Sequence, residues 1–375
     1  MNRFHSSATI TTITTAPSLN DSAEPGDDQT ILEVIPFITD GLDGGWFGKI
    51  STTVVLLLGT FGNVMTVIIL RRLRSGWSAM NVYLTALALS DTVMLYSVAL
   101  PMWTRKVLDY DVYSSHAVVC KLALWGMNTA ATLSAWLLVA LIAQRAASVV
   151  WPHRVNVICT RHKSVVIIVV ITGVCSLLDS HMLYGFTLVK IGHCTTERCT
   201  FRSTAYQEFF ASLWIKVSLV VYSVLPCVCL IASNVVLGWK LTVAMKEARE
   251  KLSTGREDSR QKNASSVTVT VIIVSVAFVV ITVPYMVYSN LFYRFASSEI
   301  HFFFYDFLFV FGLYNFAWNF YLYCLTGSRF REEFKKIMFG CCVAVLSIAG
   351  LAERSGVLTE IRGKNKNDRE TNDDF

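Results

Sequence analysis

Seven long apolar runs recur along this chain, and they constrain its fold more than any other feature. A helix needs ~20 mainly apolar residues to cross the hydrocarbon core of a bilayer, where it satisfies its own backbone hydrogen bonds. The pattern therefore predicts an all-α membrane protein, a bundle of seven transmembrane helices. The runs are residues 50–70, 82–102, 122–150, 165–186, 209–237, 267–291 and 302–325.

The composition agrees with this prediction. Of the 375 residues 53% are hydrophobic and only 16% are charged, and the mean hydropathy is +0.49. An ordinary soluble protein carries about 25% charged residues. The chain therefore has too little polar surface for a set of soluble domains. We expect its surroundings to be the lipid bilayer, and we expect no nucleic-acid partner.

Basic residues are concentrated in every second loop. The loops after the first, third and fifth runs, and the segment after the seventh, hold more Lys and Arg than the loops between them. Because basic loops stay in the cytoplasm, the N-terminus is expected outside and the C-terminus inside. We expect a multi-pass protein of the plasma membrane.

Four parts are expected along the chain. They are an extracellular disordered tail (1–47), a seven-helix domain (48–328), an amphipathic helix on the membrane surface (329–342) and a cytoplasmic tail (343–375). In the first tail, Asn20 begins an Asn-Asp-Ser glycosylation sequon on the predicted outer side. After the amphipathic segment, Cys341 and Cys342 are candidates for palmitoylation, the alternative being two buried or idle thiols.

Polar residues and prolines lie inside the apolar runs, where they are costly and usually functional. They are Gly62-Asn63-Val64, Leu87 to Asp91, Cys120, Arg145, Pro226, Phe278, Pro284 and Asn315 to Tyr323. In order and position they resemble the landmarks of rhodopsin-like (class A) G-protein-coupled receptors, over roughly residues 50–340. The end of the seventh run is similar to that of invertebrate neuropeptide receptors of the FMRFamide-like sort.

The resemblance implies a receptor that binds an extracellular ligand, activates a heterotrimeric G protein and catalyses no reaction. Arrestin is a further partner that it suggests. The residues expected to couple to the G protein are Arg145, Pro152 and Tyr323, and those expected to take part in activation are Pro226, Phe278 and Pro284. No Ser-His-Asp set, Gly-rich phosphate loop or zinc-ligand spacing lies in a plausible context, and no cofactor is expected.

An allosteric sodium ion is one implication of the resemblance. Asp91 would bind it together with Ser134, Asn315 and Asn319, because these oxygen-bearing side chains suit a hard cation. The alternative is a neutral hydrogen-bonded network that holds the helices together through Asn63.

A disulfide is a second implication. Cys120, at the outer end of the third run, is expected to pair with the loop between the fourth and fifth runs. Cys199 is preferred and Cys194 is the alternative.

Several family positions carry other residues. The Asp-Arg-Tyr of the third helix is Gln144-Arg145-Ala146 here, so Arg145 lacks its usual carboxylate, and raised basal signalling is expected. Thr282 stands where the family has an aromatic residue, Phe320 where it has proline, and Asn234 where tyrosine is usual.

Single residues narrow the ligand class. Met127 stands where amine receptors carry an aspartate, and Leu313 where opsins carry the retinal-binding lysine. A short neuropeptide with arginine and an aromatic end is expected, although aromatic residues gather at membrane interfaces whatever the ligand. The candidate ligand-binding residues are Trp103, Trp125, Met127, Asp179, Trp214, Tyr285, Tyr288, Asp306 and Phe309.

Two other functions stay open. The altered motifs around Arg145 and Thr282 are compatible with a scavenging or decoy receptor that does not couple. A transporter is disfavoured, because that class needs a charged path through the bilayer, whereas Asp91 and Asp179 are the acids plainly within the apolar runs.

Overall fold

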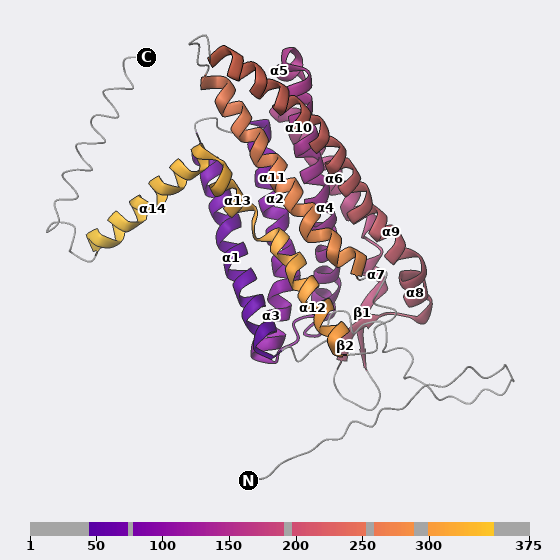
Figure 1. The fold of residues 1–375 in the computed structure, drawn as a ribbon. Helices are drawn as coiled ribbons and strands as arrows, with labels where there is room; N and C mark the ends of the chain where they lie inside the picture. Colours follow the sequence, from indigo (N-terminus) through magenta and orange to yellow (C-terminus); the bar gives the residue numbers. More distant parts are fainter. Residues whose placement is uncertain (1–44, 74–77, 191–196, 253–258, 289–298, 349–375) are drawn as a thin grey trace, which may run out of the picture.

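The computed structural model describes residues 45–73, 78–190, 197–252, 259–288 and 299–348. Within these residues, long helices lie side by side as one elongated bundle (Figure 1). Six helices are long and apolar enough to cross a membrane, and a bent pair makes a seventh span. The predicted seven-helix membrane fold is confirmed.

The first four spans contain three long helices and one helix with an internal π-helical segment. The first, third and fourth are α1 (Gly45–Arg72), α4 (Ala117–Val150) and α6 (Arg161–Leu178). The second runs through α2 (Ala79–Met94), η2 (Leu95–Ala99) and α3 (Leu100–Leu108). The short elements beside them are η3 (Pro152–Arg154), α5 (Val155–Ile158) and α7 (Met182–Gly185).

The last three spans are less regular. The fifth runs through α8 (Thr204–Phe209), η4 (Phe210–Trp214), α9 (Ile215–Leu219), η5 (Val220–Val224) and α10 (Leu225–Leu252). The sixth is α11 (Ser259–Val287). The seventh joins α12 (Glu299–Leu313), η8 (Tyr314–Phe316) and α13 (Asn319–Thr326).

The irregularity of the fifth span has a local cause at Pro226. Proline has no N–H, so the carbonyl of Val221, five residues earlier in the π-helical register, loses a donor. Trp136 of α4 supplies one, because its indole Nε1 lies 3.2 Å from that oxygen. The third span therefore stabilises the distortion of the fifth.

The seventh span bends by 56° between α12 and α13, although no proline lies there. Asn63 of α1 donates from Nδ2 to the carbonyl oxygen of Phe316, at 3.1 Å. In a regular helix that oxygen would accept from the N–H of Phe320. A side chain inserted into the backbone ladder is a known cause of helix kinks, and here it takes the place of proline.

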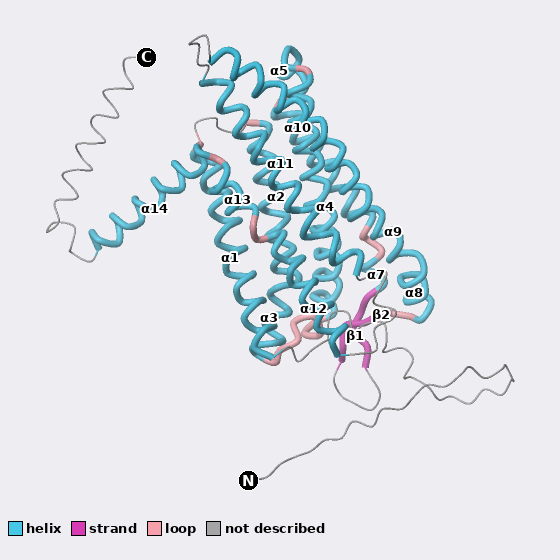
Figure 2. Tube along the Cα trace, in the orientation of Figure 1, coloured by secondary structure: helices cyan, strands magenta, loops and turns pink. Residues whose placement is uncertain are grey.

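A single β-hairpin is an exception to the predicted all-α fold, and the sequence analysis did not include it. The strands β1 (Phe186–Lys190) and β2 (Glu197–Phe201) pair antiparallel and are the only strands in the described part of the chain (Figure 2). Cys199 of β2 forms a disulfide with Cys120 of α4, which confirms the preferred pairing. The alternative partner, Cys194, lies outside the described residues.

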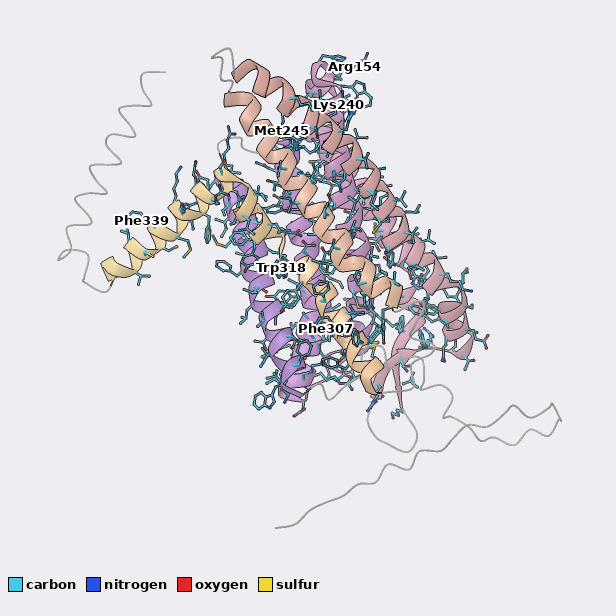
Figure 3. All side chains as sticks on the ribbon, in the orientation of Figure 1. Arg154, Lys240, Met245, Phe307, Trp318 and Phe339 are labelled. Atoms are coloured by element: carbon cyan, nitrogen blue, oxygen red, sulfur yellow. A yellow bond between two sulfur atoms is a disulfide. The ribbon has the colours of Figure 1, made fainter. Side chains whose placement is uncertain are left out.

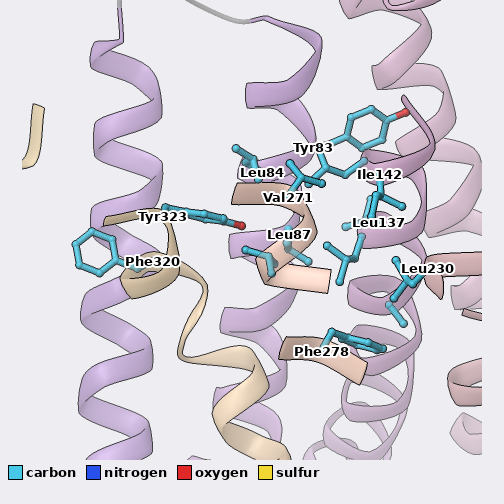
Figure 4. Close-up of a cluster of buried hydrophobic side chains, with 14 of the residues drawn as sticks. Tyr83, Leu84, Leu87, Leu137, Ile142, Leu230, Val271, Phe278, Phe320 and Tyr323 are labelled. Atoms are coloured by element: carbon cyan, nitrogen blue, oxygen red, sulfur yellow. The ribbon is translucent and has the colours of Figure 1, made fainter. Parts of the chain in front are cut away.

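The bundle thus has a hairpin end, where β1 and β2 lie, and an α14 end, where α14 (Ser328–Ile348) begins (Figure 1). The largest cluster of buried apolar residues lies in the half toward the α14 end. It joins α1, α2, α4, α10, α11, α13 and the start of α14, and Figure 4 labels ten of its members: Tyr83, Leu84, Leu87, Leu137, Ile142, Leu230, Val271, Phe278, Phe320 and Tyr323.

Large apolar side chains also cover the outside of the bundle. Figure 3 shows Phe307 and Trp318 on the surface, where 41% and 46% of their areas are exposed. Exposed apolar area on this scale is unfavourable in water and suits hydrocarbon. The surface therefore agrees with the predicted membrane location.

The helix α14 leaves the bundle at a wide angle to α13 (Figure 2). It ends at Ile348 and so is longer than the predicted 329–342. Phe330 anchors its start, because it is buried and its ring centroid lies 5.6 Å from that of Tyr323. Cys341 and Cys342 are both exposed on this helix.

Candidate functional site

A polar network in the middle of the bundle is built on Asp91, whose side chain is fully buried on α2. Ser134 of α4 donates from Oγ to Asp91 Oδ1 at 2.6 Å. Asn319 of α13 donates from Nδ2 to Asp91 Oδ2 at 2.7 Å. One carboxyl group therefore ties together the second, third and seventh spans.

The structure unites three of the four residues expected to bind sodium. Asn315 lies in η8, and no hydrogen bond joins it to Asp91 among the described residues. Asn319 presents its NH₂ group to the carboxyl, so its amide oxygen points elsewhere. The oxygens of Asp91 and Ser134 keep free lone pairs that suit a hard cation. Asn319 would need to turn its amide to add a third oxygen.

Arg145 lies near the α14 end of α4 without a carboxylate partner in the described residues. Its Nη2 contacts the thioether sulfur of Met80 on α2, and its Nε has no hydrogen-bond partner. The amide oxygen of Gln144 is likewise buried and unpaired. A partly buried cation held by a thioether is weakly stabilised, because sulfur is a poor acceptor.

The other expected coupling residues lie at the same end. Pro152 begins the short η3 turn that follows α4. Tyr323 is buried in the large apolar cluster, and its hydroxyl has no partner in the described part of the chain. Figure 4 shows this hydroxyl pointing toward the side of the cluster formed by α2 and α11.

The expected activation residues occupy three different environments. Phe278 of α11 is buried in the large cluster (Figure 4). Pro284 lies inside α11 and is exposed, whereas Pro226 is buried beside the distorted η5.

A contact that the sequence analysis missed joins the fifth and sixth spans. The hydroxyl of Ser275 on α11 is fully buried and lies 2.9 Å from Asn234 Oδ1 on α10. Asn234 stands out in the sequence because it replaces a usual tyrosine, but its partner Ser275 is visible only in the fold.

The candidate ligand-binding residues fall into three groups at the hairpin end. The first surrounds the disulfide, where Trp125 and Met127 of α4 pack against the apolar cluster that contains Trp214. Trp125 also donates from Nε1 to the carbonyl of Ser176, at 3.1 Å. Asp179 is fully buried beside these residues and accepts a hydrogen bond from Tyr222.

The second group is aromatic and joins α11 to α12. The ring of Tyr285 meets that of Phe309 edge-on with centroids 5.6 Å apart, and its hydroxyl lies 3.2 Å from that of Tyr305. Tyr288, at the end of the described part of the sixth span, stacks on Phe304 with centroids 6.2 Å apart.

The third group lies where the first, second and seventh spans meet. Trp103 of α3 donates from Nε1 to the hydroxyl of Thr53 on α1, at 2.9 Å. Asp306 of α12 forms an ion pair with Lys106 of α3, with Nζ and Oδ2 3.6 Å apart. Asp306 was expected to meet a cationic group of a ligand, but a cation of the chain itself already neutralises it.

A metal centre with several strong ligands is not formed by the described residues, in which no three His, Cys, Asp or Glu side chains gather. The polar groups present can transmit a rearrangement of helices, and they form no arrangement suited to covalent chemistry. Asn20 lies outside the described residues.

Known receptors resemble this chain along most of its length. It is 24% identical over 286 residues to the growth hormone secretagogue receptor type 1 of Sus scrofa, covering 74% of both chains. It is 22% identical over 307 residues to the human thyrotropin-releasing hormone receptor, covering 75% of both. The resemblance to FMRFamide-like receptors stays a prediction.

A family profile settles the class to which these features belong. Residues 62–323 match the family described as 7 transmembrane receptor (rhodopsin family), and this stretch includes Asp91, Arg145 and both cysteines of the disulfide. The chain therefore belongs to the rhodopsin family of seven-transmembrane receptors, and it is a non-enzymatic multi-pass membrane protein.

Proposed function

We propose that this receptor binds an extracellular peptide and activates a heterotrimeric G protein. The observation that carries the proposal is the similarity, over about three quarters of the chain, to two receptors whose names specify hormone systems. The family and the presence of Arg145 at the α14 end support coupling.

In this proposal the hairpin end faces the outside of the plasma membrane. The disulfide at that end suits an oxidising compartment. The basic loops lie at the other end, and such loops stay in the cytoplasm. Arg145 and Tyr323 would then lie near the membrane face where a G protein, and afterwards arrestin, can reach them.

Signal transfer is a shift between two populations of the helix bundle. In this proposal the closed arrangement is the one in which Ser275 and Asn234 join the sixth span to the fifth. A ligand that binds the open arrangement more tightly shifts the population by its difference in affinity. Arg145, which is partly buried and weakly held, becomes available when these spans part.

The ligand contacts would come from the first two groups of the hairpin end. Aromatic rings on α11 and α12 offer faces for an aromatic or cationic side chain. Asp179 adds an acid that has no ion-pair partner among the described residues. A short peptide that carries both kinds of side chain fits this combination.

A receptor that binds without coupling is the second candidate function. Gln144 gives Arg145 no carboxylate, and Thr282 stands where the family has an aromatic residue. Both changes affect the residues through which coupling is expected, and neither affects the hairpin end.

One experiment separates these functions. The full chain is expressed in cells, and G-protein activation is measured with and without a library of short amidated peptides. We expect a basal or peptide-evoked signal that is lost in Arg145→Ala and kept in Arg154→Ala, since Arg154 is exposed on the neighbouring turn. Surface expression without a signal from any G-protein class would support the non-coupling function.

Three modifications belong to the same proposal. We infer glycosylation at Asn20, and palmitoylation at Cys341 and Cys342, which α14 leaves exposed. Intact mass measurement before and after glycosidase or hydroxylamine treatment would detect each one.

A further inference from the structure

Asp179 is a buried acid that lacks a cation. It caps α6, its side chain is fully buried, and no described Lys, Arg or His forms an ion pair with it. Tyr222 donates to Oδ1, while Oδ2 has no hydrogen-bond partner in the described part of the chain. Leaving a buried charge unpaired costs several kcal/mol, so such a group usually serves a purpose.

Asp306 and Glu208 also lie toward the hairpin end, and both differ from Asp179 in their surroundings. Asp306 is neutralised by Lys106. Glu208 is exposed at the start of the fifth span, where water solvates its charge. Asp179 is therefore the acid of the three that is both desolvated and uncompensated by a cation.

Thr129 of α4 shares a side-chain hydrogen bond with the Asp179 carboxyl. Trp214 of η4 contacts Tyr222, with ring centroids 6.5 Å apart, and the His181 ring lies 4.1 Å from that of Trp214. Trp214 Nε1 and His181 Nε2 are both buried without a hydrogen-bond partner among the described residues. These residues, with Asp179 and Tyr222, are named the Asp179 cluster.

We propose that the Asp179 cluster binds a cationic side chain of the ligand, a guanidinium or an ammonium group. The proposal rests on the function proposed above, in which the chain binds a peptide. Asp179 Oδ2 accepts from the cation, and Thr129 Oγ accepts a second N–H. The rings of Trp214 and Tyr222 add cation–π attraction, which is strongest in a desolvated site.

His181 completes the set of acceptors. Its Nδ1 lies 2.7 Å from the hydroxyl of Tyr206. In the neutral tautomer with hydrogen on Nδ1, the ring donates to Tyr206, and Nε2 is left as a buried acceptor. The cation thus meets a carboxylate, a hydroxyl and an imidazole nitrogen.

The position of Tyr222 links this subsite to the helices. Tyr222 lies in η5, the π-helical segment that precedes Pro226. A cation on Oδ2 draws negative charge away from Oδ1, and so weakens the hydrogen bond by which the Tyr222 hydroxyl holds η5 against Asp179 at the end of α6. The partly exposed Trp125 and Met127 pack against the apolar cluster that contains Trp214 and Tyr222.

The test uses the purified full chain and two charged probes, N-acetyl-arginine amide and N-acetyl-lysine amide. N-acetyl-citrulline amide is the neutral control, because it differs from the arginine probe mainly in charge. We expect at least one charged probe to raise Tm by roughly 2–4 °C at several times its Kd, and citrulline to have little effect. No rise with either charged probe would overturn the proposal.

Variants then place the effect on Asp179. Asp179→Asn should abolish the difference between charged and neutral probes, whereas the control Glu208→Gln should keep it. Tyr222→Phe removes the hydroxyl that donates to Asp179, and the charged probe should then bind severalfold more tightly. This variant tests the assignment to Asp179 if Asp179→Asn does not fold. A charged-probe effect that is unchanged in both Asp179→Asn and Tyr222→Phe would contradict the assignment.

The same variants separate this proposal from the proposed function. If no peptide activates the wild-type chain in cells, the proposed function fails, but the probe result on the purified protein still stands. If peptides activate wild type and Asp179→Asn with equal potency, the proposed function holds and the Asp179 subsite is wrong.

Discussion

The hydroxyl of Ser275 lies 2.9 Å from Asn234 Oδ1 and 2.8 Å from the carbonyl oxygen of Ile272. A hydroxyl has one hydrogen and cannot donate fully to both oxygens. The arrangement is satisfied when Ser275 donates to Ile272 and the Asn234 amide is turned so that its NH₂ donates to Ser275, a choice that heavy-atom positions leave equivalent. Either way, a buried polar contact joins the fifth and sixth spans.

Removal of this contact should raise basal signalling. Ser275→Ala deletes a hydrogen bond worth about 1 kcal/mol, present in the closed arrangement and lost when the spans part. We expect roughly a 2- to 10-fold rise in ligand-independent G-protein activation, measured per receptor at the cell surface. Ser218→Ala is the control, because that hydroxyl bonds only to its own helix. Equal basal activity in wild type and Ser275→Ala would show that the contact does not hold the closed state.

A carboxylate beside Arg145 should have the opposite effect. Gln144→Asp offers an anion to a guanidinium whose Nε is buried and unpaired, and so stabilises the closed arrangement. Basal activation should fall severalfold relative to wild type in the same assay. If the wild-type basal signal equals that of an empty vector, the closed arrangement is not weakly held and the prediction is wrong.

The spans could be predicted from local apolar runs in the sequence, and the disulfide from the resemblance to the receptor family. Apolar runs reveal the spans without any knowledge of their partners. Cys120 and Cys199 follow from the resemblance. The contacts of Asp91 with Ser134 and Asn319 also match the positions that the resemblance singled out.

What the sequence did not reveal depends on partners far along the chain. The bend of the seventh span comes from Asn63, 253 residues away from Phe316. Asp306 was expected to be free for a ligand, but the fold places Lys106 beside it. Such pairings are decided by packing between helices, and a single sequence carries no periodic signal for them.

Sodium should stabilise the receptor through Asp91. In the purified protein, exchange of choline chloride for NaCl at constant ionic strength should raise Tm by a few degrees, because an ion that binds the folded state stabilises it. Asp91→Asn keeps the shape of the side chain and should abolish this rise. A wild-type Tm that does not depend on the cation would favour the neutral hydrogen-bonded network instead.

The bend of the seventh span should depend on Asn63. Asn63→Ala removes the donor to the Phe316 carbonyl and leaves that buried oxygen unpaired, at a cost of about 1–3 kcal/mol. The loss should lower Tm by several degrees in detergent. Thr66→Val, one turn along the same helix, is the control, since its hydroxyl bonds only to the carbonyl of Gly62. If Asn63→Ala lowers Tm no more than Thr66→Val does, the Asn63 contact is not what stabilises the bend.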